Sequence, residues 1–387
     1  MPITITKIDT WIVEVPTIRP HVLSMTSINR QVMMLLFVHC SDGVTGTGEG
    51  TTIGGLAYGD ESPEGMKLAI DQYCAPLVLG REGHDPARLM ALVGDHVVGN
   101  HFAKNALETA LLDAAAQRAG QPLSTLLGGR VRNQLPVLWT LASGDTACDI
   151  DEAQAMIEAG RHNTFKLKIG KRPLAQDIAH VAAIKNALGS QASVRVDVNQ
   201  AWNPVLAQRG ARMLADAGVD LIEQPLARRD RRGMARLTRN SPVAIMADEA
   251  LRGPHDAMEF ARTRAADAFS IKPSQAGGLF AARDVAAIAR AAGIGLYGGT
   301  MLEGGIGTAA SAQLFSTFPA IEWGTELFGP LLLTEELLAE PLVYRNFTLQ
   351  VPDGPGLGVR LDLEKARYFR RDGPTRTLAN IPFQETV

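Results

Sequence analysis

Three acidic residues recur in the second half of the chain, each near the end of a short apolar run. Asp197 closes VRVD, Glu223 closes LIE and Asp248 closes IMAD, at intervals of 26 and 25 residues. That interval fits one strand, one helix and their loops. A single acidic strand end could be a solvated terminus, but three in phase offer the oxygen ligands that a hard divalent cation prefers. We call these three residues the carboxylate triad.

Lysines flank the triad on both sides in the sequence. Lys166 and Lys168 lie in TFKLKIG, and Lys272 ends the later run FSIK. Strand side chains alternate, so Lys166 and Lys168 share a face. An exposed edge strand would explain this pattern, but the other face is apolar, so the lysines are expected inside a barrel. Lysines beside other charges exchange protons readily, which indicates proton transfer at a carbon atom.

Short apolar runs alternate with helical stretches from residue 131 onward. Eight candidate strands are present: VLWTLAS, TFKLKIG, VRVDVNQ, DLIEQPL, VAIMADE, AFSIKPS, GIGLYGG and IEWGTEL. This α/β alternation predicts parallel strands covered by helices. A doubly wound sheet would alternate in the same way, but eight units of even length favour a closed barrel, whose strand ends converge on one mouth.

The segments before and after this region have a different hydrophobic pattern. Residues 3–15 and 32–50 predict antiparallel strands, with a turn at 41–43, and residues 102–118 carry one apolar helical stripe. The start of the chain is therefore an α+β module. The segment after residue 341 is again strand-like and rich in turns, and we expect it to rejoin that module.

Composition narrows the class of partner. The 387 residues include 38 basic and 41 acidic ones, a net charge of −3 without a basic cluster, so we expect no nucleic acid and no membrane partner. The three cysteines, Cys40, Cys74 and Cys148, form no CxxC or Cys/His motif. This spacing argues against a disulfide framework or structural zinc. The start of the chain lacks the pattern of a secretory signal, so we expect a cytoplasmic enzyme acting on a small molecule.

Longer motifs extend the pattern over essentially the whole chain. They include TFKLKIG, VRVDVNQAW, LIEQPL, MADE, PTIRPHVLSM, GEGTTIGGLAYGDESPEG, GLYGGTMLEGGIGT and WGTELFGPLLLTEE. In order and spacing these motifs resemble the muconate cycloisomerases, the muconate-lactonising enzymes of the enolase superfamily. The resemblance implies a modified (β/α)7β TIM barrel over residues 131–340. It also implies an α+β capping domain formed by residues 1–130 and the returning segment 341–387.

The resemblance also implies an activity: metal-dependent, reversible lactonisation of the dicarboxylate cis,cis-muconate to muconolactone in the catabolism of catechol. The triad would bind Mn²⁺ or Mg²⁺, with Asn199 and Glu249 orienting its side chains. Lys168 would be the acid/base for the α-proton, tuned by Lys166. Lys272 would face them from the other side. A homo-octamer is implied as well.

Other site residues follow from the same resemblance. Glu326, in WGTEL, matches a proton donor or supporting carboxylate, although it could instead pair with Lys272. His21 is expected in a loop, PTIRPH, near the substrate. Ile53 and Tyr58 lie in N-terminal segments that resemble the family's lid, and Thr300 lies in GLYGGTMLEGGIGT. We therefore expect these four residues to contact the substrate. Hydrophobic core is the competing interpretation of Ile53.

One position departs from the family pattern, and several activities remain open. Gln275 stands where the cycloisomerases usually carry a second lysine, so syn or anti addition and the tolerance for chlorinated muconates stay undecided. The triad alone fits chloromuconate cycloisomerase, N-acylamino-acid racemase, dipeptide epimerase and o-succinylbenzoate synthase equally well. Mandelate-racemase-like dehydratases fit less well, because they commonly have a His-Asp pair where this chain has Lys272. A non-catalytic binding barrel would have no need of three carboxylates facing three lysines.

Overall fold

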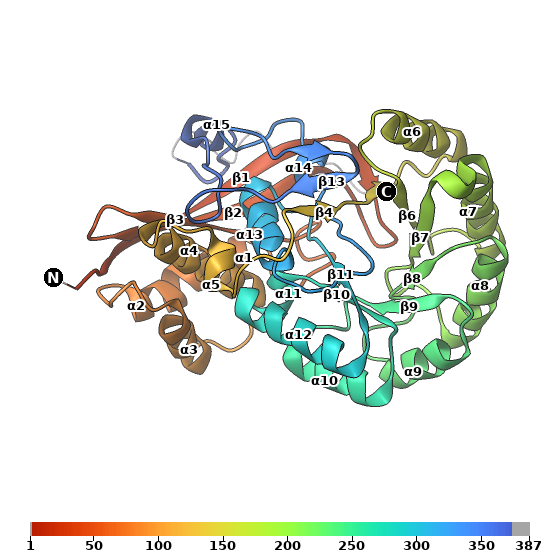
Figure 1. Cartoon of the computed structure of the whole chain (residues 1–387), viewed down its shortest axis with the longest axis horizontal. Helices are drawn as coiled ribbons and strands as arrows, with labels where there is room; N and C mark the ends of the chain where they lie inside the picture. Colours follow the sequence, from red (N-terminus) through yellow and green to blue (C-terminus); the bar gives the residue numbers. More distant parts are fainter. Residues whose placement is uncertain (1, 374–387) are drawn as a thin grey trace.

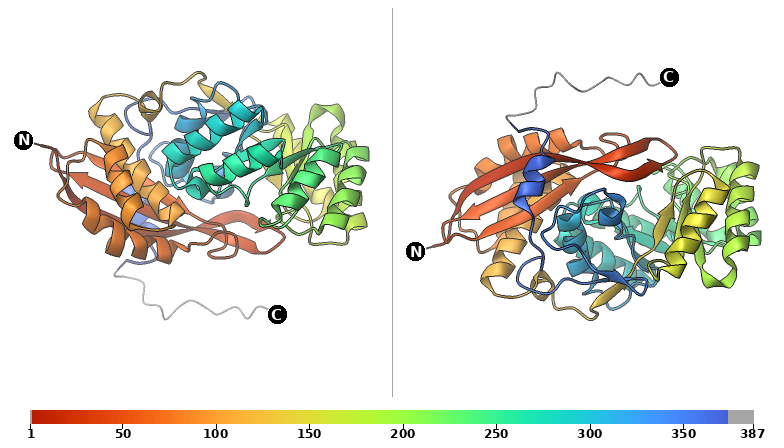
Figure 2. Two further views of the ribbon diagram at one scale, coloured as in Figure 1. Left: turned by 90° about the horizontal axis from the view of Figure 1, so that it is seen from below. Right: turned by 90° about the horizontal axis from the view of Figure 1, so that it is seen from above.

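A computed structural model describes residues 2–373 of the chain. It begins with a three-stranded antiparallel sheet of β1 (Ile5–Val22), β2 (Ser27–Cys40) and β3 (Thr45–Thr51). Strand β1 runs past the expected end at residue 15, with a register shift between Pro16 and His21. Pro16 comes directly after that end, and proline disfavours a continuing strand because it donates no ladder hydrogen bond. The strand instead accommodates its prolines at this irregularity, and the β1–β2 hairpin becomes a long arm beside the barrel (Figure 2).

Helices cover one face of this sheet (Figure 1). They are α1 (Pro63–Ala69), η1 (Ile70–Cys74), α2 (Ala75–Val78), α3 (Pro86–His96), α4 (His101–Arg118) and α5 (Leu123–Leu126). Helix α4 confirms the prediction for residues 102–118. It lies so close to β3 that a Cβ atom at Gly46 or Gly48 would be 1.9 Å from a carbonyl oxygen of α4. Glycine on the strand and alanine on the helix therefore allow this close packing.

Seven parallel strands form the barrel sheet, in the order β11-β10-β9-β8-β7-β6-β5. The strands are β5 (Trp139–Leu141), β6 (Thr164–Lys168), β7 (Ser193–Asp197), β8 (Leu221–Glu223), β9 (Ala244–Ala247), β10 (Ala268–Ile271) and β11 (Gly295–Gly298). The connecting helices are α6 (Thr146–Glu158), α7 (Leu174–Leu188), η2 (Gly189–Gln191), α8 (Pro204–Asp216), α9 (Arg231–Asn240), α10 (Pro254–Thr263), α11 (Pro273–Ala276), α12 (Leu279–Ala292) and α13 (Gly305–Phe315). Helices α6 to α10 lie outside the sheet, whereas α11 packs against α4 of the cap (Figure 1).

The eighth predicted strand, IEWGTEL, closes the barrel without forming a regular ladder. Thr325 makes isolated parallel bridges to Val137 on one side and to Gly298 on the other. The Thr325 N–H bonds to the Pro136 carbonyl at 2.8 Å, and the Glu326 N–H bonds to the Gly298 carbonyl at 2.7 Å. The prediction of a full strand was therefore wrong in detail, because the segment pairs over too few residues. The closed barrel is confirmed.

The C-terminal segment returns along the barrel to the first sheet as far as residue 373, and the rest of the predicted segment 341–387 lies outside the described residues. Strands β12 (Tyr344–Arg345) and β13 (Thr348–Gln350) pair antiparallel, and β13 also pairs with β4 (Gln134–Pro136). Two further helices, α14 (Gly329–Leu332) and α15 (Leu363–Tyr368), precede the bridge from Arg370 to Val13 on β1. The domain limits at residues 130 and 340 remain predictions.

Two further features bear on the sequence analysis: the absence of a membrane-spanning helix among the described residues and the state of the cysteines. No helix within residues 2–373 is long and apolar enough to cross a membrane. The three cysteines are free thiols, with Cys40 and Cys74 buried and Cys148 exposed.

Candidate active site

The barrel places the triad and the lysines at the carboxyl ends of neighbouring strands. Lys168 on β6 is in register with Asp197 on β7, and Asp197 is in register with Glu223 on β8. Asp248 follows the end of β9, and Lys272 follows the end of β10. Parallel strands end at the same edge, so residues spread over about 100 positions of sequence meet at one mouth. The structure thus brings together the residues predicted to do chemistry.

Lys166 sits at the bottom of this cluster, with 1% of its surface exposed. Its Nζ donates to Glu223 Oε2 at 2.9 Å and to Glu326 Oε2 at 2.6 Å. Burial alone lowers the pKa of Lys166, but Glu223 and Glu326 outweigh it and hold the pKa well above its ordinary value. Lys166 is therefore a fixed positive charge beneath the triad.

Two further ammonium groups approach the triad from different sides. Lys168 Nζ lies 2.6 Å from Asp197 Oδ2, and Lys272 Nζ lies 2.7 Å from Asp248 Oδ2. Strand β8 separates the strands that carry Asp197 and Asp248, so the two lysines face each other across Glu223. Burial lowers the pKa of Lys272, but the charge of Asp248 dominates and raises it. A substrate in the mouth would meet one ammonium group on each side.

Glu326 is held from several directions. Besides Lys166, it accepts hydrogen bonds from Thr140 Oγ1 and Tyr297 Oη, each at 3.1 Å. Its ion-pair partner is Lys166, not Lys272 as the alternative interpretation expected. Thr140 and Tyr297 were not predicted from the sequence, because a hydroxyl on a barrel strand carries no signal of its own.

Asn199 and Glu249 lie beside the triad. Asn199 Nδ2 donates to Asp197 Oδ2 at 3.0 Å and to Glu249 Oε1 at 3.1 Å. Sequence analysis missed Gln224, whose Oε1 accepts the Asp248 N–H at 2.9 Å. Its only signal is its place next to Glu223. Gln275, noted as a departure, donates from Nε2 to Asp248 Oδ1 at 3.2 Å.

The donor set suits a hard cation, and ammonium groups pair with its oxygens in this structure. Lys166, Lys168 and Lys272 each contact a triad carboxylate, and within residues 2–373 no three acidic, histidine or cysteine side chains are already arranged around a common point. Among the same residues, Glu223 Oε1 and Glu249 Oε2 are buried without a hydrogen-bond partner. Burial and the charge of Asp197 raise the pKa of Glu223 well above its ordinary value. Burial and the charge of Asp248 raise that of Glu249 to about 8. A divalent cation would compensate this concentration of buried oxygens.

Of the four predicted substrate contacts, Tyr58 makes the most direct connection to the cluster. Its hydroxyl donates to Asp248 Oδ2 at 2.5 Å and accepts from Lys272 Nζ at 2.6 Å. His21 lies in β1 and not in a loop. It is buried, and burial together with the charge of Lys168 lowers its pKa well below the ordinary value. Ile53 is buried, and the buried Thr300 donates its hydroxyl to Glu303.

Comparison with known proteins assigns the chain to a family. Residues 7–128 match the N-terminal domain model of mandelate racemase and muconate lactonizing enzyme, and residues 149–366 match the enolase C-terminal domain-like model. A muconate cycloisomerase from Acinetobacter lwoffii is 58% identical, covering 98% of both chains. The chain belongs to the muconate cycloisomerases of the enolase superfamily. It is an isomerase, and members of the superfamily depend on a divalent metal.

Further relatives refine the position within the cycloisomerases. A muconate cycloisomerase from Pseudomonas putida is 54% identical over 95% of this chain and 99% of its own. A chloromuconate cycloisomerase from Cupriavidus necator is more distant, at 45% over the same shares. The crystal structure of the muconate lactonizing enzyme from Pseudomonas fluorescens complexed with muconolactone has a TM-score of 0.95 and 55% identity. It covers 96% of this chain and 100% of that one.

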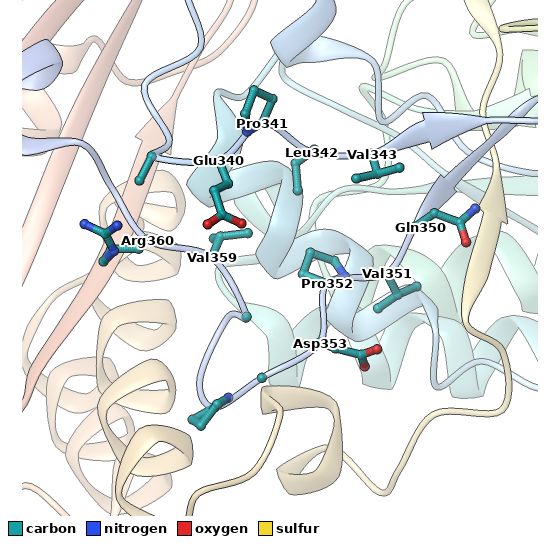
Figure 3. A pocket seen from close by; sticks show the side chains of 14 residues that line it. Glu340, Pro341, Leu342, Val343, Gln350, Val351, Pro352, Asp353, Val359 and Arg360 are labelled. Atoms are coloured by element: carbon teal, nitrogen blue, oxygen red, sulfur yellow. The ribbon is translucent and has the colours of Figure 1, made fainter.

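One cavity reaches the edge of this cluster. It has a volume of about 230 Å³, is lined by Lys168 but by no member of the triad, and is bordered by Leu23 and Ser24 at the tip of the β1–β2 arm. By contrast, the hollow of about 520 Å³ in Figure 3 is lined by the C-terminal segment, including Glu340 and Arg360. None of the predicted site residues lines that hollow, so it is separate from the chemistry.

Proposed function

We propose that this cycloisomerase converts cis,cis-muconate to muconolactone, with Lys168 as the proton donor to carbon. The observation that best supports this proposal is the triad with one ammonium group on each side. Lys168 pairs with Asp197, and Lys272 pairs with Asp248. That arrangement suits a dianionic substrate, because each developing negative charge has a positive group within reach. Mn²⁺ or Mg²⁺ fits the triad, and when bound it would act as a Lewis acid that neutralises carboxylate charge.

The residues of the chain supply the remaining steps. One substrate carboxylate is oriented at the triad, where Asn199 donates a hydrogen bond to Asp197 and is itself held by Glu249. The distal carboxylate forms the new C–O bond to the conjugated diene, and the electron pair moves toward the α-carbon. Lys166 and Lys272 then stabilise the developing charge more than they stabilise the substrate. Lys168 donates its proton to the α-carbon, and in the reverse direction it removes that proton.

Turnover of cis,cis-muconate by metal-loaded and metal-stripped protein tests this proposal. We expect activity that is lost on chelation and restored by Mn²⁺ or Mg²⁺. A chloromuconate and a small panel of N-acyl amino acids serve as competing substrates. A higher kcat/KM for any competitor than for cis,cis-muconate would contradict the assignment.

Racemisation of N-acyl amino acids is the second candidate. One observation favours it, because lysines on opposite sides of the triad could add and remove a proton on either face of an α-carbon. The identity values favour lactonisation, since the relatives at 54–59% identity are muconate cycloisomerases. Exchange of the α-proton of an N-acyl amino acid with solvent, accompanied by inversion, would establish the second activity.

We also propose a homo-octamer in the cytoplasm, by analogy with the cycloisomerases that the sequence resembles. Multi-angle light scattering at micromolar concentration should give eight times the 41.4 kDa chain mass. A monomer under these conditions would contradict the assembly. Recovery of the activity outside the cytoplasmic fraction of the source cells would contradict the location.

A further inference from the structure

The segment 52–62 connects β3 to α1 and carries Tyr58 to the barrel mouth. Tyr58 bonds to both Asp248 and Lys272, and Lys272 Nζ also lies 4.7 Å from the centre of the Tyr58 ring. This one side chain therefore contacts a member of the triad and the lysine opposite Lys168. A shift of the segment would leave both partners in place but remove the hydroxyl that bonds to each of them.

Within the described chain, the hydrogen bonds and ion pairs from this segment to the barrel come from Tyr58 and Asp60. The Asp60 carboxylate lies 3.2 Å from Arg228 Nη1, and its other oxygen pairs with Arg252 Nη2. Arg228 follows β8 and Arg252 follows β9, so one carboxylate joins two barrel loops. Glu61, the next residue, instead accepts the N–H groups of Phe102 and Ala103 in the capping helix α4.

The β1–β2 arm, which also lies over the mouth, is attached to the barrel by contacts that are less exposed to solvent. On β1, Arg19 donates to Glu152 Oε1 at 3.0 Å and to the Thr140 carbonyl at 2.8 Å, and the side chains of Arg19 and Glu152 are 18% and 20% exposed. The Asp60, Arg228 and Arg252 side chains are 42%, 46% and 37% exposed. Salt and water compete more strongly with the exposed pairs. Of the two attachments, the one at Asp60 is thus the easier to release.

We propose that Asp60 is a positioning residue, which holds segment 52–62 against the barrel through Arg228 and Arg252 so that the Tyr58 hydroxyl bonds to Asp248 and Lys272. This inference rests on the proposed function for its kinetic consequence, but not for its structural one. Each exposed ion pair typically changes an equilibrium by a factor of about 1.4 to 5, so two pairs give a factor of about 2 to 30.

The test compares Asp60→Asn with Glu259→Gln, which removes a carboxylate–arginine pair within helix α10 whose carboxylate is 44% exposed, close to the 42% of Asp60. The single-turnover rate constant at saturating concentration is measured, because it does not depend on substrate steering or product release. We expect Asp60→Asn to lower it in proportion to the loss of the docked segment, by as much as about 30-fold. Asp60→Glu should restore part of the loss, and Glu259→Gln should have no effect. In a Tyr58→Phe background, adding Asp60→Asn should lower the single-turnover rate constant little further. An equal loss with and without the Tyr58 hydroxyl would overturn the role.

A second measurement needs no substrate. A nitroxide label on Leu56→Cys, where the native side chain is 67% exposed, reports the motion of the segment in a Cys148→Ser background. Asp60→Asn should raise the label mobility, and added salt should raise it in the parent but little in the variant. Unchanged mobility in Asp60→Asn would overturn the proposal. If the parent fails to turn over cis,cis-muconate, the proposed function fails, while the label still decides the role of Asp60.

Discussion

Replacing Glu108 by glutamine should flatten the pH dependence of stability. Glu108 projects from α4 and is 4% exposed, and its Oε1 accepts the Phe280 N–H at 3.0 Å at the start of the barrel helix α12. Burial outweighs the backbone hydrogen bonds and raises its pKa to about 7, from 4.5. The folded protein therefore keeps this carboxyl protonated at pH values where the unfolded chain has released the proton.

The sign and size of the effect follow from that difference. Because the folded pKa is raised, the contribution to the free energy of unfolding is fully present below pH 4.5. It is lost as the pH rises toward 7. Raising the pKa from 4.5 to about 7 corresponds to about 3 kcal/mol, at about 1.36 kcal/mol for each tenfold change in the ionisation equilibrium. The N–H groups of Leu279 and Phe280 both contact the Glu108 carboxyl, whereas the amide of Glu108→Gln has one accepting oxygen, so one N–H of α12 loses its partner at a cost of about 1 kcal/mol. The variant should be about 1 kcal/mol less stable at pH 4 and about 2 kcal/mol more stable at pH 8.

Urea unfolding of parent and variant between pH 4 and pH 8 measures this crossing. Glu82→Gln is a suitable control, because its carboxylate is exposed and should leave the slope unchanged. Parallel stability curves for the parent and Glu108→Gln across this range would refute the reasoning, since they would show that Glu108 ionises alike in both states.

The other predictions concern the site and its surroundings. Alanine at any member of the carboxylate triad should abolish turnover and weaken metal binding while the circular dichroism spectrum stays native; stoichiometric metal with normal activity would remove that residue from the ligand set. Lys168→Ala should lower turnover by about 10²–10⁴-fold or more and stop deuterium entering the product at the α-carbon, whereas Lys272→Ala should leave that exchange measurable. The opposite pattern of exchange would reverse the facial assignment. Gly278→Ala should destabilise the fold, because its φ is +143° and a Cβ would lie 2.5 Å from Glu108 Oε1; an unchanged melting temperature would contradict this.

The sequence was sufficient to predict the barrel and to group its polar strand ends. Asp197, Glu223 and Lys168 each stand at the last position of a strand, so the strand period alone placed them together. The strand period could not predict which carboxylate pairs with each lysine. Glu326 meets Lys166 and not Lys272, because barrel closure through Thr325 decides which strand ends become neighbours.

Side chains without an ionisable group in the mouth gave the weakest sequence signal. Gln224 orients the Asp248 backbone, and Thr140 holds Glu326, yet neither residue type is rare at a strand end. The long β1–β2 arm was also missed, because Pro16 argued against a continuing strand. In each case a tertiary contact determines the outcome, and local pattern carries no information about the partner.

The capping domain as a whole is fixed more firmly than the segment that completes the site. Three of its buried carboxylates accept hydrogen bonds from backbone N–H groups elsewhere in the chain. Glu49 accepts from Gly304 and Gly307, Glu108 accepts from Phe280, and Asp113 accepts from Leu357. Such bonds are shielded from solvent, and salt screens them much less than exposed ones. Segment 52–62 instead reaches the barrel through Tyr58 and the exposed pairs of Asp60. Displacing this segment therefore breaks fewer shielded bonds than separating the whole cap from the barrel.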